Sequence, residues 1–238
     1  MEGMVLHRGG EIVTKETLDL IPLPQETDSY IPVSHYHLAD KLLVMSQDIL
    51  KDYTLIGENY AIARQGNQMF AVLKFKEQES NIGLSVAFRN SYDRSMSLGI
   101  AIGASVFICD NLSLTGEIVV MKKHTKNVWC SLEDLAISTL YKSQRNFQQI
   151  CADSETMRGR QMNDQQAFAL MGNLFGNEII SPRQIVALKD EWQKPTYEVF
   201  QERNLWSFYN ATTEALKSCP PISIMEKHIQ AHSLILEA

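Results

Sequence analysis

Residues 82–103 read IGLSVAFRNSYDRSMSLGIAIG, a sequence with the pattern of a β-sheet core. Large apolar residues alternate with small ones on both sides of a polar centre, which predicts two strands with one bulky, apolar face. The opposite face carries small residues: Gly83, Ser85, Ala87, Ser97, Gly99, Ala101 and Gly103. A strand accepts this much glycine where something approaches it closely. We expect a helix of the same chain to do so, and the alternatives are a neighbouring subunit or a nucleic-acid backbone.

Further strands are predicted on either side of this pair. Asn90–Asp93 forms the turn within the pair, since Asn, Ser and Asp side chains bind local backbone groups. An upstream hairpin joins strands at 60–64 and 69–75, and Gly66 or Asn67 takes a positive φ in its turn. Downstream, 104–109 is a short buried strand and 118–121 is another. Together they predict a mostly antiparallel sheet over residues 55–122.

Helices flank this sheet on both sides in the sequence. Ser34 caps a helix that runs to about Lys51, and a long helix runs from Ser131 toward Met157. Shorter helices follow at 163–176, 181–192 and 204–217, and a last one follows Pro220-Pro221. Pro22, Pro24 and Pro32 oppose a regular helix near the N-terminus.

These elements predict an α+β fold with a helical C-terminal half. We expect one domain over residues 1–238, because no segment has the composition of a flexible linker. Within it, residues 1–33 form an extended arm, 34–125 a helix and the β core, and 131–238 the helical half.

Composition indicates an ordinary globular protein, with 45% hydrophobic and 21% charged residues. No apolar run is long enough to span a membrane and no secretory leader is recognisable, so we expect a cytoplasmic location. The net charge is −6, which opposes strong nucleic-acid binding. The charge is uneven, however: residues 1–60 carry −6, 61–160 carry +3 and 161–238 carry −3.

One polar group has the composition of a metal site. Asp93, Asp110, Glu117 and His124 are predicted at strand ends, and three carboxylates with an imidazole could hold a divalent cation if those ends converge. The simpler interpretation is that the aspartates stabilise turns while Glu117 and His124 pair with neighbours. The simpler interpretation needs no cofactor, and we favour it.

Basic residues in the central third suggest a nucleic-acid surface. Cations with interleaved aromatic rings supply phosphate contacts and stacking platforms for a single strand. The alternative is a solvated charged face with the rings in the core. The cations are Arg89, Arg94, Lys122, Lys123, Lys126, Lys142, Arg145, Arg158 and Arg160, and the rings are Tyr92, Trp129 and Tyr141.

Several segments resemble the phage/plasmid-like protein family that carries a domain of unknown function (DUF932-like). The resembling segments are 29–35, 67–70, 89–93, 106–112, 116–117, 123–125, 191–192, Pro195, Phe200, Arg203 and 205–217, which together reach across nearly the whole chain. The resemblance implies an origin in a phage, prophage or plasmid. It implies no reaction, because it brings no catalytic residues with it.

Three functions follow as hypotheses. The first is a non-catalytic accessory protein that binds single-stranded nucleic acid, either as a monomer or as a homo-oligomer. The order of its predicted elements, a helix, then hairpins, then a long helix, is similar to that of single-strand annealing recombinases. The second is an interaction protein that binds a host protein, for example a defence protein. The third is a metal-dependent enzyme. A phosphate-binding loop and a nucleophile elbow are both absent from the sequence, so we lean toward a non-enzyme.

Overall fold

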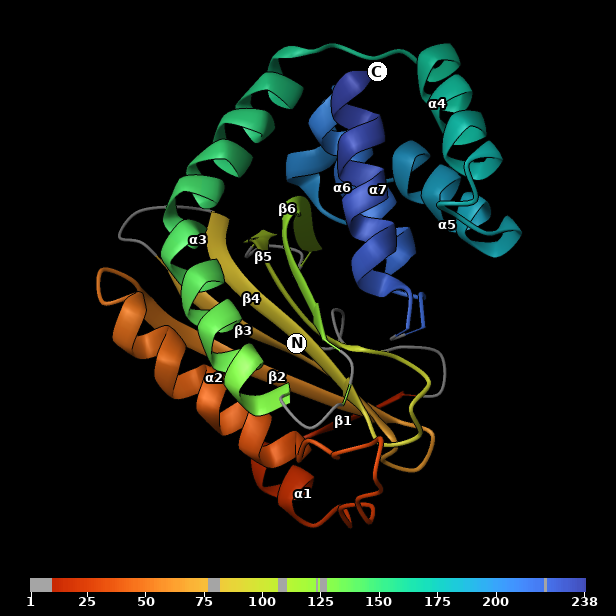
Figure 1. Cartoon of the computed structure of the whole chain (residues 1–238). Coiled ribbons are helices and arrows are strands. Elements are labelled where there is room, and N and C mark those ends of the chain that lie inside the picture. The colour runs from red at the N-terminus through yellow and green to blue at the C-terminus, as the bar shows by residue number, and fades with distance from the viewer. Residues whose placement is uncertain (1–9, 77–81, 107–110, 123, 125–127, 221) are drawn as a thin grey trace.

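The computed structural model of the chain describes residues 10–76, 82–106, 111–122, 124, 128–220 and 222–238. Within these ranges the strands form one six-stranded antiparallel sheet, in which each strand pairs with the next one in sequence (Figure 1). The strands are β1 Gly10–Val13, β2 Thr54–Ala63, β3 Gln68–Lys76, β4 Ile82–Ser91, β5 Leu98–Val106 and β6 Asn111–Lys122. The predicted antiparallel sheet is therefore confirmed.

Helices precede and follow the sheet, as predicted for an α+β fold with a helical C-terminal half. They are α1 Lys15–Asp19, α2 His35–Ile49, α3 Val128–Gly159, α4 Asp164–Gly176, α5 Pro182–Gln193, α6 Leu205–Leu216 and α7 Ile224–Glu237, with a short 3-10 turn at Glu198–Phe200.

Local chemistry explains where several helices begin. The Ser34 hydroxyl accepts a hydrogen bond from the His37 N–H at the start of α2. Asn163 and Gln166 form a reciprocal capping box at α4, and Ser181 does the same with Gln184 at α5. Ser34 and Ser181 are predicted caps, and Asn163 stands at the predicted start of its helix; each satisfies backbone N–H groups that have no partner within the first turn. The long helix differs, because it begins at Val128 and Ser131, where the sequence predicts its start, lies inside it.

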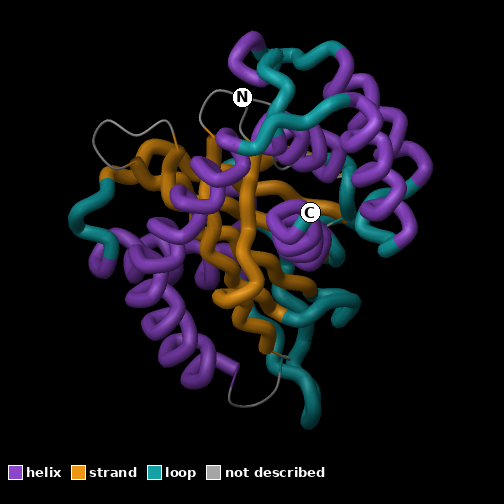
Figure 2. Tube along the Cα trace, turned by 90° about the horizontal axis from the view of Figure 1, so that it is seen from above, coloured by secondary structure: helices purple, strands orange, loops and turns teal. Residues whose placement is uncertain are grey.

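Both faces of the sheet are covered, so it is the middle of three layers. The helices α2 and α3 pack on one face, and α6 and α7 pack on the other (Figures 1 and 2). Two consecutive residues of β4 show the division, because neighbouring side chains of a strand point to opposite faces. Asn90 donates to the carbonyl of Val33 beside α2, whereas Arg89 pairs with Glu226 of α7.

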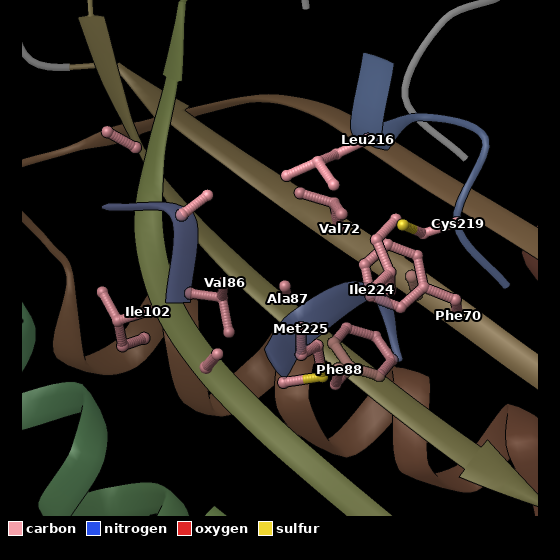
Figure 3. Close-up of a cluster of buried hydrophobic side chains, with 14 of the residues drawn as sticks. Phe70, Val72, Val86, Ala87, Phe88, Ile102, Leu216, Cys219, Ile224 and Met225 are labelled. Carbon is pink, nitrogen blue, oxygen red and sulfur yellow. The ribbon is translucent and has the colours of Figure 1, made fainter. Parts of the chain in front are cut away.

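The face with small residues is the one covered by the C-terminal helices. Ala87 belongs to a buried cluster that also contains Phe70 and Val72 of β3 and Leu216, Cys219, Ile224 and Met225 from the region of α6 and α7 (Figure 3). Small strand residues allow a helix to approach the sheet closely. A helix of the same chain therefore occupies this face, as expected from the sequence.

Three expectations need correction. Residues 1–33 are not simply an extended arm, because β1 pairs with β2 and α1 precedes the prolines. The predicted separate strand at 104–109 is instead the end of β5 up to Val106, and residues 107–109 lie outside the described part. The strand predicted at 118–121 is longer and begins at Asn111. Its register against β5 shifts between Ala101 and Gly103: residues 115–118 of β6 lie opposite the single residue Ile102, so β6 has three extra residues there, which hides the alternation.

No helix within the described ranges has the length and apolar character needed to cross a bilayer.

The substitution Ala87→Leu tests the close packing on this face. Three added carbon atoms have to fit beneath α7, so we expect the free energy of unfolding to fall by about 1–3 kcal/mol. Urea unfolding followed by circular dichroism measures it. Ala152→Leu, which adds the same atoms on the exposed side of α3, should change it by less than about 0.5 kcal/mol. Equal losses in the two variants would contradict the packing argument.

Candidate functional site

The turn between β4 and β5 is braced by the carboxylate of Asp93. It accepts hydrogen bonds from the Ser95 backbone N–H at 3.0 Å, from the Ser95 hydroxyl, and from the Gln68 amide at 3.3 Å. Burial raises the pKa of Asp93, but the hydrogen bonds from Ser95 and the charge of Arg64 outweigh it and hold the pKa below its usual value. Asp93 thus performs the turn role that the sequence allowed, but Asn90 and Ser91, predicted in the same turn, belong to β4, so the turn begins only at Tyr92.

Arg94 follows Asp93 with a left-handed backbone, at φ +60°. Its guanidinium lies 4.3 Å from the ring centre of Tyr30. Tyr30 is itself buried, and its hydroxyl donates to the Tyr92 carbonyl at 3.1 Å. The turn therefore presents Arg94 on a fixed aromatic base.

Behind the turn, a chain of hydrogen bonds joins Gly66, His35, Asn90 and His124, which we call the Asn90 relay. His35 Nε2 lies 3.0 Å from the Gly66 carbonyl, and His35 Nδ1 lies 2.9 Å from Asn90 Nδ2. Asn90 Nδ2 also donates to the Val33 carbonyl at 2.6 Å, and Asn90 Oδ1 lies 2.7 Å from His124 Nε2.

The relay determines the proton positions. A carbonyl only accepts, so His35 Nε2 carries the proton and, in the neutral ring, His35 Nδ1 accepts from Asn90. The amide oxygen of Asn90 then accepts from His124, so His124 carries its proton on Nε2. Burial lowers the pKa of His35 to about 4 and also lowers that of His124, which keeps both rings neutral at pH 7.

Tyr92 and Arg89 were predicted on the nucleic-acid surface, and the structure places both in the interior. The Tyr92 ring stacks on His35 with centroids 3.8 Å apart, and its hydroxyl accepts from the His35 backbone N–H. Arg89 donates to both carboxylate oxygens of Glu226 and to the carbonyl of Ile222. The face alternation of β4 directs Arg89 to α7, so neither residue presents a free group to a ligand, and both are corrected to structural roles.

The remaining predicted residues are exposed, buried, or outside the described part of the chain. Lys142 and Arg145 are exposed on α3, Arg94 is exposed on its turn, and His124 is buried. Asp110, Lys123 and Lys126 lie outside the described residues, as do the side chains of Glu117 and Lys122. Among the described side chains no group of three potential metal ligands occurs, so Asp93 and His124 do not belong to such a site there.

An exposed row on α3 carries two of the predicted cations. The row, which we call the α3 stripe, consists of Ile137, Ser138, Tyr141, Lys142, Arg145, Gln148 and Gln149. These positions recur every three or four residues and therefore share one side of the helix. The ring of Tyr141 is 72% exposed. From residue 135 to residue 152 the sequence has no carboxylate, and neither cation of the stripe forms an ion pair within the described residues.

Tyr30, His35 and Asn90 are site residues that the functional predictions did not include. No sequence signal joins them, because His35 and Asn90 are 55 positions apart and meet only through the sheet. The half-buried Trp129 also differs from the predicted exposed ring, since it packs against the core.

The burial of His35 predicts a pH dependence of stability. Below pH 6.5 the unfolded chain binds a proton at His35, whereas the folded chain binds it only near pH 4. The free energy of unfolding should therefore fall as the pH drops from 6.5 to 4, by up to about 3 kcal/mol for this group. Urea titrations at pH 7.0, 5.5 and 4.5 measure it. His35→Gln should flatten the dependence and His37→Gln, at an exposed position, should not; parallel curves for wild type and His35→Gln would refute the assignment.

Comparison with known proteins identifies the family. The model of the family described as "Domain of unknown function (DUF932)" matches residues 27–225, which include β2 to β6 and α2 to α6. No curated protein and no solved structure matches the chain. The match covers far more than half of the sequence and agrees with the family expected from its motifs. The chain therefore belongs to the DUF932 family.

Proposed function

We propose that this protein binds single-stranded nucleic acid through the α3 stripe. The observation that carries the proposal is the exposed ring of Tyr141, which stands beside Lys142 and one helical turn from Arg145. An aromatic face stacks on any base, and two cations next to it contact phosphates. We further propose a non-catalytic accessory protein of phage or plasmid type, acting in the bacterial cytoplasm, because the resemblance in the motifs implies that origin.

The stripe has the physical properties that such a ligand needs. From Ile137 to Gln149 it extends about 18 Å along the helix, at 1.5 Å per residue. The absence of carboxylates between Asp134 and Asp153 keeps repulsion of phosphates low. The exposed amide of Gln148 adds a hydrogen-bonding group at its end, whereas the amide of Gln149 donates to Asp153 at 2.8 Å. The opposite side of α3 is held on β5 and β6, so the stripe is presented by a helix fixed to the sheet.

The overall charge sets the expected strength of binding. With a net charge of −6 the molecule as a whole repels a polyanion, so attraction is confined to the local field of the stripe. We therefore expect modest affinity that decreases steeply with salt.

Fluorescence anisotropy with a labelled oligothymidylate and a labelled duplex, at 20 and 150 mM salt, tests the proposal. We expect preference for the single strand. Tyr141→Ala should weaken binding about 5- to 100-fold, since stacking contributes about 1–3 kcal/mol per base. The double variant Lys142→Gln/Arg145→Gln should reduce the slope of log K against log salt by about 1.4, at about 0.7 for each phosphate contact.

The matched control is Arg183→Gln/Lys189→Gln, which removes the same charge from exposed positions on α5. It should leave the slope nearly unchanged. Equal effects of the two double variants, or no binding of the single strand at 20 mM salt, would refute the α3 stripe as the binding surface. Absence of single-strand binding at 20 mM salt would favour the hypothesis of a host-protein partner. Affinity capture from a host lysate would then test that hypothesis.

A further inference from the structure

A pocket of about 400 Å³ opens beside the turn between β4 and β5. It is lined by Ser29, Tyr30, Arg94, Ser95, Met96, Ser97 and His124. These residues come from the segment before α2, from the turn and from the segment after β6, so only the folded chain brings them together. The volume is in the range of small-molecule sites. None of these residues belongs to the α3 stripe.

Several polar groups in this pocket have unused hydrogen-bonding capacity. The guanidinium of Arg94 has no carboxylate partner within the described residues, since Asp93 is engaged by Ser95, Gln68 and Arg64. The hydroxyls of Ser29 and Ser97 likewise make no hydrogen bond within those residues. The pocket therefore offers a cation and two hydroxyl donors.

His124 supplies an acceptor at the same place. It is only 7% exposed, and it lines the pocket. In the Asn90 relay, His124 Nε2 carries the proton and donates it in a hydrogen bond to Asn90, so Nδ1 bears a lone pair. Nδ1 has no hydrogen-bond partner within the described part of the chain. Nδ1 is not one of the fully buried unpaired polar atoms of the described residues, so it is reached by solvent and can accept a hydrogen bond from water or from a ligand. The same relay prevents the ring from turning to satisfy Nδ1 elsewhere.

The backbone at Arg94 is consistent with a binding role. A left-handed conformation at a residue other than glycine costs free energy and persists where the surroundings impose it, as they often do at ligand sites. In this turn the bonds of Asp93 and the ring of Tyr30 impose it. The effect is to hold the guanidinium at the pocket.

We propose that this pocket binds a small phosphate monoester of the nucleoside monophosphate class. Arg94 pairs with the phosphate through its planar fork, and the hydroxyls of Ser29 and Ser97 donate to phosphate oxygens. His124 Nδ1 accepts a hydrogen bond from a sugar hydroxyl, because a neutral acceptor selects a ligand that also carries a donor. The inference does not depend on strand binding by α3, and either one can fail without the other.

Isothermal titration calorimetry of the full chain with AMP, inorganic phosphate and adenosine tests the proposal. We expect AMP to bind, phosphate to bind more weakly, and adenosine not to bind. Arg94→Gln should weaken AMP about 10- to 100-fold, as for loss of a charged hydrogen bond. His124→Gln should weaken AMP about 5-fold while leaving phosphate nearly unchanged. Unchanged thermal midpoints verify that the variants are folded.

Arg183→Gln is the matched control, because it removes an exposed guanidinium on α5, which neither lines the pocket nor contacts Asp93. It should retain AMP binding. No heat from AMP at millimolar concentration, equal affinity for adenosine and AMP, or equal losses in the Arg183 and Arg94 variants would overturn the proposal. Competition by a 5′-phosphorylated oligonucleotide, but not by its 5′-hydroxyl form, supports a strand end as the source. If neither oligonucleotide competes with AMP, the result supports a free mononucleotide as the source of the phosphate.

Discussion

The amide of Asn90 is the group on which the arrangement of this molecule depends. It is fully buried, and it donates to Val33 and His35 while it accepts from His124. A buried amide left unpaired is costly, so the segment before α2 and the segment after β6 have to meet at this point of β4. Arg89, its neighbour in the strand, imposes the same condition on the opposite face through Glu226. Two consecutive residues thus tie the helical layers to the sheet.

This constraint also decides which groups remain available for chemistry. His35, Tyr92 and Arg89 are engaged within the interior, so they explain stability and not binding. His124 differs, because the relay occupies one of its nitrogens and leaves the other at a pocket. On α3 the division follows the helix faces: one side packs on β5 and β6, and the other carries Tyr141, Lys142 and Arg145 in solvent. The groups that still have hydrogen-bonding capacity or charge available for a ligand lie at the margins of the packed layers.

Comparison of the predictions with the structure separates local from long-range information. The caps at Ser34, Asn163 and Ser181 are predictable, because each acts on backbone groups within three residues of itself. The positive φ in the β2–β3 turn is found at Gly66, one of the two predicted positions, together with Arg64 and Gln65. The burial of Arg89 was not predictable, because its partner Glu226 is 137 positions away and a lone cation in a strand usually indicates a surface.

The α+β class, the face periodicity of β4 and β5, and a small-residue face that requires close contact all follow from the order of the residues alone. These properties depend on side-chain alternation and on backbone hydrogen bonding, both of which are local. Three further features emerge only in the folded chain: α6 and α7 fill that face, β1 extends the sheet, and Arg94 and His124 share a pocket. Sheet register and helix packing act over tens of residues. They determine which partner each polar group meets, and the sequence offers many chemically equivalent partners.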